Sequence, residues 1–414
     1  MMHSTEERIE RAILIAIDND DDSDLDELSL LVDTAGATEV GRIVQKREAR
    51  HGGHYLGKGK LDEVLALVRE QEADLVVADD ELTATQQKRL AEMLGVKVLD
   101  RTMVILDIFA QRAMTQEGKA QVELAQCRYN LSHLTGLGVS LSRQAGTAAR
   151  GGVGNRGPGE KKLELDRRHI RNRITQLGRE LKEIRENRKL HRKKREKSGI
   201  PVVALVGYTN AGKSTLMNAL TDAGVLAENK LFATLDTTTR KAVMPGGSAE
   251  VLFTDTVGFI NKLPHNLIQA FRATLEELNH ADILLHIVDG SSPKFREQMD
   301  VVHDTLRVLE CLDKPIITVI NKTDVMPFVG GAQDWIPISA LTGDNLAALF
   351  YAVERQITLL QKRVEILLPY NMGSLLSQIH TTCKILKSES REDGTYLEIF
   401  ATPEVMGRAK AYMV

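Results

Sequence analysis

The sequence predicts an α/β protein in which a domain with a doubly wound, mostly parallel sheet is preceded by another α/β domain with a long helical hairpin. A small α+β module follows it. Three observations favour this class. Short apolar runs alternate with helix-like stretches along most of the chain, a glycine-rich loop joins one such run to a helix, and one long segment has helical spacing throughout.

Composition narrows the class of protein further. The chain has 414 residues, 43% hydrophobic and 27% charged, with a net charge of −3. This apolar fraction and the lack of a glycine period exclude disordered and collagen-like chains. The three cysteines form no CxxC pair, which favours free thiols in a reducing compartment. Because the N-terminus lacks a secretory signal and no apolar run approaches a membrane span, we expect a cytoplasmic monomer without stable membrane insertion.

Four regions are expected from the pattern along the chain. They are an N-terminal α/β domain (1–112), a helical hairpin with a Gly-rich tip (113–199), a second α/β domain (200–362) and a small C-terminal domain (363–414). In the first region we expect strands at 12–17, 39–44, 75–79 and 96–99, with helices at 25–35, 60–69 and 84–94. The hairpin helices are expected at 114–134 and 160–195. In the C-terminal domain we expect strands at 364–368 and 396–400, with helices at 375–380 and 403–412.

A phosphate-binding loop lies near the start of the second α/β domain. An apolar run at 201–206 leads into GYTNAGKS and then into a helical stretch, which is GxxxxGK[ST] in its required strand–loop–helix setting. Glycines let backbone N–H groups surround phosphates at a helix N-terminus, the lysine reaches the β- and γ-phosphates, and the final serine binds Mg²⁺. The predicted loop is Gly207, Tyr208, Thr209, Asn210, Ala211, Gly212, Lys213 and Ser214.

Two further motifs predict that the nucleotide is GTP. The first is the run Asp255, Thr256, Val257 and Gly258, which follows a strand and places a second carboxylate near Mg²⁺ and an N–H near the γ-phosphate. The second is the run Asn321, Lys322, Thr323 and Asp324, followed by Ser339, Ala340 and Leu341. The Asp324 carboxylate can accept two hydrogen bonds from the N1–H and N2–H₂ edge of guanine, a donor pair that adenine lacks.

A switch segment between these motifs should supply one threonine to the Mg²⁺ shell and sense the γ-phosphate. The sequence offers four candidates there, Thr234, Thr237, Thr238 and Thr239, and their chemistry alone does not choose among them. The position after the 255–258 motif is Phe259, whose ring cannot orient the attacking water. We therefore expect slow intrinsic hydrolysis that a partner accelerates.

These motifs resemble those of the HflX family of translation-associated GTPases, over about residues 10–365. The residues that carry the resemblance are FATLD with TTR (232–240), DTVGFI (255–260), NKTD (321–324), SAL (339–341), the segments at 100–113 and 118–126, LSRQ (141–144), RGPGE (156–160) and LDRR (165–168). Departures from the family pattern occur at Thr237, usually Pro, and at Ser132 and His133, usually Pro-Arg.

The resemblance implies a P-loop GTPase domain and the large ribosomal subunit with its RNA as partner, with the GTP state controlling association or ribosome splitting. It selects Thr234 as the second Mg²⁺ ligand beside Ser214. It also implies that one stretch contacts the nucleotide, namely Phe232, Ala233, Thr234, Leu235 and Asp236. Asn210 is similar to the P-loop asparagine of GTPases that recruit K⁺, which makes K⁺ a candidate second cation.

The hairpin carries a concentration of positive charge that suits RNA. Residues 167–197 hold fourteen Lys or Arg against four Glu, whereas residues 1–39 hold twelve acids against two Arg. Phosphate contact with structured RNA is the favoured interpretation, and a solvated helix face or an anionic membrane surface are the alternatives. The RNA-contact candidates are Arg150, Arg156, Arg167, Arg168, Arg171, Arg192, Lys193, Lys194 and Arg195.

Two functional alternatives stay open at this stage. A GTPase of tRNA modification or a membrane-linked regulator would share the nucleotide motifs but would need an additional domain that the sequence does not reveal. The segment LGKGK at 56–60 resembles a phosphate loop without its spacing, so it is either a second nucleotide site, such as one for ATP, or an RNA-facing or structural turn.

Overall fold

The structure is a computed structural model that describes residues 9–18, 23–46, 52–146, 158–196, 200–221, 230–245, 250–264, 267, 275–327, 334–360, 362–401 and 403–414. These residues form two compact units. One runs to Lys182 and the other from Glu183 to Val414, apart from a short stretch at 263–271 that groups with the first.

The N-terminal domain is built on a four-stranded parallel sheet in the order β2-β1-β3-β4. Its strands are β1 (Glu10–Asp18), β2 (Ala37–Lys46), β3 (Leu75–Ala78) and β4 (Lys97–Asp100), and its helices are α1 (Ser23–Ala35), α2 (Lys58–Glu70), α3 (Ala84–Leu94) and α4 (Arg101–Arg112). The predicted βα alternation is confirmed. The helix α4 was not expected, because its apolar run is buried on most sides and has no clear helical period.

Local sequence fixes the boundaries of α3. The side chain of Thr83 accepts a hydrogen bond from the Gln86 N–H, and the Gln86 side chain accepts one from the Thr83 N–H, which completes a capping box. Gly95 ends the helix in the left-handed conformation with φ of 70°. Between these ends, Leu90 and Leu94 enter the core of the domain.

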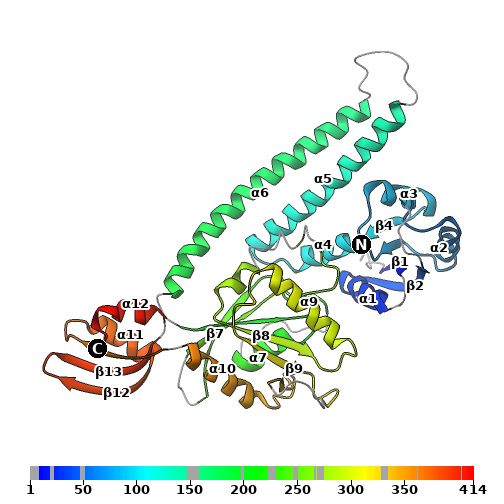
Figure 1. Cartoon of the computed structure of the whole chain (residues 1–414). Coiled ribbons are helices and arrows are strands. Elements are labelled where there is room, and N and C mark those ends of the chain that lie inside the picture. Colours follow the sequence, from blue (N-terminus) through cyan, green and yellow to red (C-terminus); the bar gives the residue numbers. More distant parts are fainter. Residues whose placement is uncertain are drawn as a thin grey trace, which may run out of the picture. The chain divides into compact units, whose positions relative to one another are not determined.

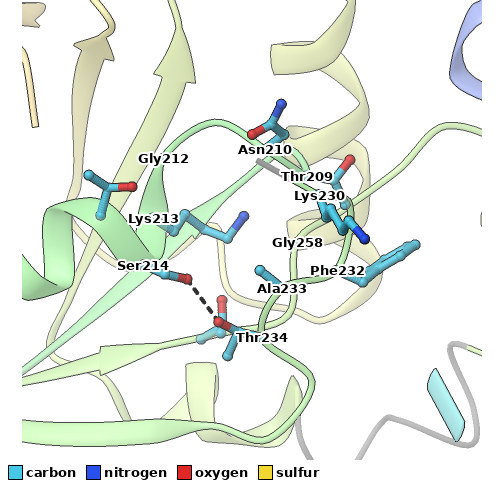
Figure 2. A pocket seen from close by; sticks show the side chains of 12 residues that line it. Thr209, Asn210, Gly212, Lys213, Ser214, Lys230, Phe232, Ala233, Thr234 and Gly258 are labelled. Atoms are coloured by element: carbon cyan, nitrogen blue, oxygen red, sulfur yellow. Dashed lines mark hydrogen bonds between the residues drawn. The ribbon is translucent and has the colours of Figure 1, made fainter. Parts of the chain in front are cut away.

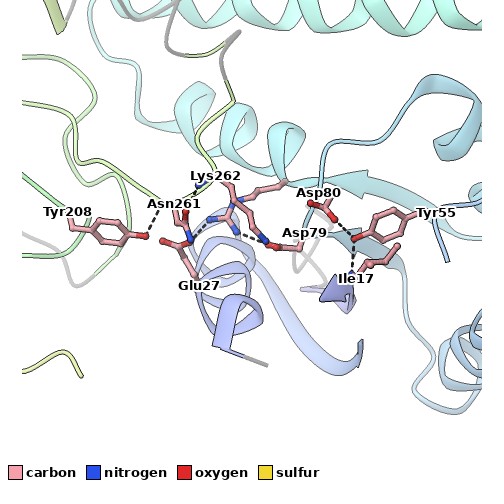
Figure 3. A network of polar contacts seen from close by, with 9 residues as sticks. Ile17, Glu27, Tyr55, Asp79, Asp80, Tyr208, Asn261 and Lys262 are labelled. Carbon is pink, nitrogen blue, oxygen red and sulfur yellow. Dashed lines mark hydrogen bonds and ion pairs between the residues drawn. The ribbon is translucent and has the colours of Figure 1, made fainter. Parts of the chain in front are cut away.

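A cluster of polar side chains lies beyond the carboxyl ends of β3 and β4 (Figure 3). The Tyr55 hydroxyl donates to Asp80 at 2.8 Å, and Arg101 forms ion pairs with Asp79, at 2.6 Å, and with Glu27. Asp79 and Arg101 are almost completely buried. Removing one partner of such a buried ion pair would leave the other charge uncompensated.

The hairpin consists of two long antiparallel helices, α5 (Gln116–Gly146) and α6 (Pro158–Glu196), which lie side by side in Figure 1. At its base, Ala120 and Leu124 of α5 pack with Leu177 and Leu181 of α6. One cross-helix ion pair, between Arg173 and the partly exposed Glu123 at 2.6 Å, sits beside this apolar contact. No helix in the described part of the chain is both long and apolar enough to cross a membrane.

The second α/β domain has a six-stranded sheet in the order β10-β9-β8-β5-β7-β6, parallel except for β6. Its strands are β5 (Val202–Gly207), β6 (Thr238–Val243), β7 (Glu250–Asp255), β8 (Ile283–Asp289), β9 (Ile316–Asn321) and β10 (Ile336–Pro337), and its helices include α7 (Lys213–Thr221), α9 (Phe295–Val308) and α10 (Leu346–Leu360). The predicted doubly wound, mostly parallel sheet is confirmed. The loops after β5, β7 and β9 leave the carboxyl edge, where ligands bind in open α/β sheets.

The C-terminal residues form a three-stranded antiparallel sheet in the order β11-β13-β12. Its elements are β11 (Lys362–Leu368), α11 (Gly373–Thr382), β12 (Lys384–Arg391), β13 (Gly394–Ala401) and α12 (Pro403–Ala409). Leu375 and Ile379 of α11 and Val405 of α12 pack with Leu397 and Ile399 of β13. The strand β12 was not predicted, because its sequence KILKSESR is mostly polar.

Candidate functional site

The phosphate-binding loop follows the buried strand β5 and opens into α7. At Gly207, a Cβ atom would lie 2.3 Å from the Ile287 carbonyl oxygen of β8, so only glycine lets the two backbones approach this closely. Gly212 has φ of +92°, and a Cβ there would lie 2.2 Å from the Asn321 amide nitrogen. The sequence motif therefore fixes both the turn and its contact with the loop after β9.

Lys213 points back into this loop, and only 7% of the residue is exposed. Its ammonium donates to the carbonyl oxygens of Tyr208 at 2.7 Å and Gly207 at 3.2 Å. Burial lowers the pKa of Lys213 to about 8, and the charge of Asp255 opposes that shift. The loop thus holds a desolvated cation that an anion would stabilise.

Three oxygen-bearing side chains meet beside Lys213, and two of them appear in Figure 2. Ser214 Oγ lies 2.8 Å from Thr234 Oγ1, and both hydroxyls donate to Asp255 Oδ2 at 2.8 Å. Asp255 is completely buried, burial raises its pKa, and its Oδ1 atom has no hydrogen-bond partner among the residues that the structure describes. An unpartnered buried carboxylate oxygen beside two hydroxyls suits a hard cation such as Mg²⁺, which prefers oxygen ligands.

Among the described residues, no group of three or more His, Cys, Asp or Glu side chains could hold a metal ion. A cation at the Ser214–Thr234–Asp255 cluster would therefore depend on hydroxyl groups, one carboxylate, water and the phosphates of a nucleotide. This is the usual ligand set for Mg²⁺ in nucleotide enzymes, where the ion keeps several waters.

The switch segment is held over the loop by buried apolar side chains. Leu231, Phe232 and Leu235 are each less than 5% exposed, and Phe232 adopts a left-handed backbone with φ of 53°. This packing brings Thr234, rather than the three threonines at 237–239, against Ser214. Farther along, the Thr239 hydroxyl lies 3.0 Å from that of Thr254 in β7.

The segment after β7 is fixed to the phosphate-binding loop by backbone hydrogen bonds. The Phe259 N–H donates to the Gly207 carbonyl at 3.1 Å, and the Thr209 N–H donates to the Phe259 carbonyl at 2.7 Å. Phe259 is 1% exposed, so its ring packs in the interior. The Thr256 hydroxyl donates to the Leu205 carbonyl at 2.6 Å. Gly258 lines a pocket that it shares with residues of the phosphate-binding loop and the switch segment, called the phosphate pocket below.

The loops after β9 and β10 form the part of the site expected to read the base. Asn321 joins them to the phosphate-binding loop, because its amide donates to the Ala211 carbonyl at 2.8 Å and accepts from the Ala340 N–H at 2.9 Å. The Ser339 hydroxyl donates to Asp324 Oδ1 at 2.6 Å, and Asp324 itself is exposed. The last residue of this set, Leu341, is 78% exposed.

Two neighbours of the site were missed from the sequence. Asp289 at the end of β8 pairs with Lys322 at 2.7 Å, and a carboxylate at the end of a parallel strand was the available signal. Lys230 lines the phosphate pocket just before the switch segment. No motif marks it.

The RNA-contact candidates that the structure describes differ in how far their side chains are exposed to solvent. Arg168 and Arg171 are exposed on α6, whereas Arg167 is only 18% exposed in its side chain and donates to the Leu134 carbonyl at 2.9 Å. The candidates at 192–195 belong to α6, but their side chains are outside the described residues. Arg150 and Arg156 also lie outside the described residues.

The segment at 56–60 contributes to a turn within the N-terminal domain. Gly57 precedes α2, and its N–H donates to the Gln45 side chain at 2.7 Å. The adjacent Tyr55 is buried, with its hydroxyl accepting from the Ile17 N–H at 3.2 Å. Lys60 pairs with Glu63 within α2. These contacts favour the structural interpretation of the segment.

Comparison with known families covers most of the chain. Residues 22–110 match the family described as GTP-binding GTPase N-terminal, residues 112–195 match GTP-binding GTPase Middle Region, and residues 202–322 match 50S ribosome-binding GTPase. The three matches follow one another in chain order.

Individual relatives span nearly the whole sequence. A GTPase HflX of Caldanaerobacter subterraneus is 48% identical over 409 residues, covering 98% of this chain and 94% of the relative. The GTPase HflX of Escherichia coli is 39% identical over 397 residues, covering 93% and 92%. A solved GTP-binding protein from Sulfolobus solfataricus in complex with GDP covers 85% of this chain and 100% of its own, with 23% identity and a TM-score of 0.45.

Proposed function

The chain belongs to the HflX family of GTPases, and from this premise we propose that it hydrolyses GTP with Mg²⁺ at the 207–214 loop and associates with the large ribosomal subunit in the cytosol. GTP hydrolase activity follows from the family. The observation that supports this site most strongly is the convergence of Ser214, Thr234 and Asp255 on one point beside the buried ammonium of Lys213.

Each residue of this site would have its own contact with the phosphates or with Mg²⁺ during phosphoryl transfer. The Lys213 ammonium would leave the carbonyls of Gly207 and Tyr208 and contact the β- and γ-phosphates. The negative charge of the phosphates would compensate the ammonium for the hydration that it lost on burial. Ser214 and Thr234 would hold Mg²⁺ directly, and Asp255 would hold it through water. When bound, the ion neutralises charge on the phosphate oxygens. Thr234 reaches this point because the buried side chains of its segment pack down, and we expect GTP with Mg²⁺ to stabilise that position.

The choice of guanine is assigned to Asp324. One carboxylate oxygen is fixed by the Ser339 hydroxyl, which orients the group toward solvent at the mouth of the site. Asn321 holds the base-reading loops and the phosphate-binding loop in one arrangement. Asn210 has φ of +60° and lines the phosphate pocket, and we assign it to a second cation, K⁺.

Water orientation is not assigned to any residue of this chain. Phe259 occupies the position where other GTPases place a glutamine, and its ring is buried. We therefore propose that intrinsic hydrolysis is slow and that the large ribosomal subunit stimulates it.

Proton uptake tests the proposed role of Lys213. Burial lowers the pKa of Lys213 to about 8 in the free protein. Phosphate binding favours the ammonium, so GTP binding should take up protons, and this uptake should increase from pH 7 to pH 9. GTP affinity accordingly falls as the pH rises above 8.

Calorimetry in buffers of different ionisation enthalpy measures this uptake. The terminal phosphate of GTP itself contributes little to the proton uptake above pH 7, because its second pKa is about 6. Uptake that stays at zero from pH 7 to 9, or a net release of protons, would show that Lys213 does not receive the phosphates.

The contact with RNA is tested at the two exposed arginines of α6. Replacing Arg168 and Arg171 by glutamate should raise the large-subunit concentration for half-maximal GTPase stimulation by on the order of 10-fold, because phosphate contacts dominate RNA affinity. Basal hydrolysis should not change. The matched control is Arg307→Glu on α9, which is 68% exposed and pairs with Asp304. An equal response of both proteins would favour the solvated-helix interpretation.

A further inference from the structure

Positive charge beyond that of the P-loop lysine and the bound metal ions accelerates phosphoryl transfer. In many P-loop enzymes an additional cation contacts the γ-phosphate in the transition state and accelerates hydrolysis by several orders of magnitude. Here the residue after the 255–258 motif is a buried phenylalanine, so that position adds no polar group. A cation for the γ-phosphate would therefore have to come from another residue that lines the phosphate pocket.

Among the residues that the structure describes, twelve line the phosphate pocket and two of these carry a charge, Lys213 and Lys230 (Figure 2). The two lysines approach from different elements. Lys213 enters from the N-terminus of α7 and is almost completely buried, whereas Lys230 precedes the switch segment and is exposed.

The backbone next to Lys230 is fixed. Leu231 and Phe232 follow it directly and are 4% and 2% exposed, so both side chains are buried. Four residues after Lys230, Thr234 contacts Ser214 and Asp255. The segment that brings Thr234 to the proposed Mg²⁺ position therefore also places Lys230 in the lining of the pocket, where a cation can stabilise a transition state.

We propose that Lys230 is a catalytic residue, a cation supplied within the same chain that contacts the γ-phosphate as it leaves GDP. Water attacks the γ-phosphorus, the bond from that phosphorus to the β–γ bridging oxygen breaks, and GDP departs with the electron pair. The oxygen and both protons of the water end on inorganic phosphate, which forms as H₂PO₄⁻ and can then release one proton to solvent. Lys230 stays protonated throughout and stabilises the negative charge of the transition state. The inference rests on the proposed GTPase site.

Single-turnover GTP hydrolysis by the full chain, with and without large ribosomal subunits, tests this role. Lys230→Gln should lower the rate of the chemical step by on the order of 10²-fold, as for loss of one fixed transition-state donor. The Kd values of GTP and GDP should change by less than about threefold, because uniform binding is not what the residue provides. Lys230→Arg should retain most of the rate.

The matched control is Lys241→Gln, since Lys241 is 51% exposed in its side chain and pairs with Glu250 at 2.5 Å, away from the lining of the pocket. A complex of GDP with aluminium fluoride, which mimics the transition state, should form with the control and fail with Lys230→Gln.

The possible results distinguish failure of the Lys230 role from failure of the proposed GTPase site. Unchanged hydrolysis by Lys230→Gln, or weaker GTP binding with an unchanged chemical step, overturns the catalytic role while leaving the GTPase site intact. Failure of the unsubstituted protein to bind or hydrolyse GTP overturns the proposed site itself, and this is seen before any variant is compared.

Discussion

Replacing Lys213 with alanine is expected to weaken GTP binding by on the order of 10³-fold, because two charge-assisted hydrogen bonds to the phosphates are lost. The protein should remain folded. In the free protein Lys213 is desolvated and donates to the carbonyls of Gly207 and Tyr208, so its removal also relieves the cost of burying its charge. Nucleotide titration by fluorescence, with circular dichroism as the test of folding, measures both effects.

Lys241→Ala is the control, since it removes a lysine from β6 that is ion-paired with Glu250. GTP affinity of that variant should equal that of the unsubstituted protein. Retention of tight GTP binding by Lys213→Ala would refute the phosphate role of the lysine. Loss of the folded state would instead show that Lys213 holds the loop together.

Replacing Asp324 with asparagine should change which base the protein accepts. Guanine offers the N1–H and N2–H₂ donors, and an asparagine amide nitrogen facing them places donor against donor. A site built to hydrogen-bond one edge rejects the wrong partner by on the order of 10⁴-fold. Xanthine has a carbonyl oxygen in place of the amino group, so XTP should bind Asp324→Asn better than GTP does.

Competition between GTP, XTP and ATP for the same site measures this reversal. Asp304→Asn on α9 is the control, because Asp304 is 67% exposed and pairs with Arg307. Equal binding of GTP to the unsubstituted protein and to Asp324→Asn would show that the base is read elsewhere. Displacement of GTP by ATP from the unsubstituted protein would remove guanine specificity altogether.

Local motifs predict the phosphate-binding loop well, because its residues act through the backbone of one short turn. The choice of Thr234 among four threonines needed tertiary packing. Leu231 and Phe232 are buried there, and this brings Thr234 within 2.8 Å of Asp255. The family resemblance selected the same residue, whereas chemistry alone did not.

Side chains that lie outside the sequence motifs, and whose contacts depend on residues far away in the chain, were harder to predict. Lys230 belongs to no motif, and its place in the pocket follows from the packing of its neighbours. Arg167 was expected among the RNA contacts, yet it is turned toward the Leu134 carbonyl of the facing helix. A charge count along a helix does not distinguish a basic residue that pairs across the hairpin from one that faces solvent, such as Arg171.

The alternation of strands and helices gave a reliable fold class, and its failures have physical causes. The strand β12 is polar because it lies at one edge of a small sheet, with β13 as its neighbour there. The helix α4 is apolar on most sides because it packs within the N-terminal domain, so its helical period is hidden. Both segments depend on tertiary contacts that a single sequence does not display.

We propose that the guanine nucleotide bound at the 207–214 loop controls association with the large ribosomal subunit. Co-sedimentation with separated ribosomal subunits, in a non-hydrolysable GTP analogue or in GDP, tests this control. The protein should pellet with the large subunit in the analogue, several-fold less in GDP, and not with the small subunit. Equal pelleting in both nucleotides, or no pelleting with the large subunit by protein that has bound the analogue, would contradict the claim.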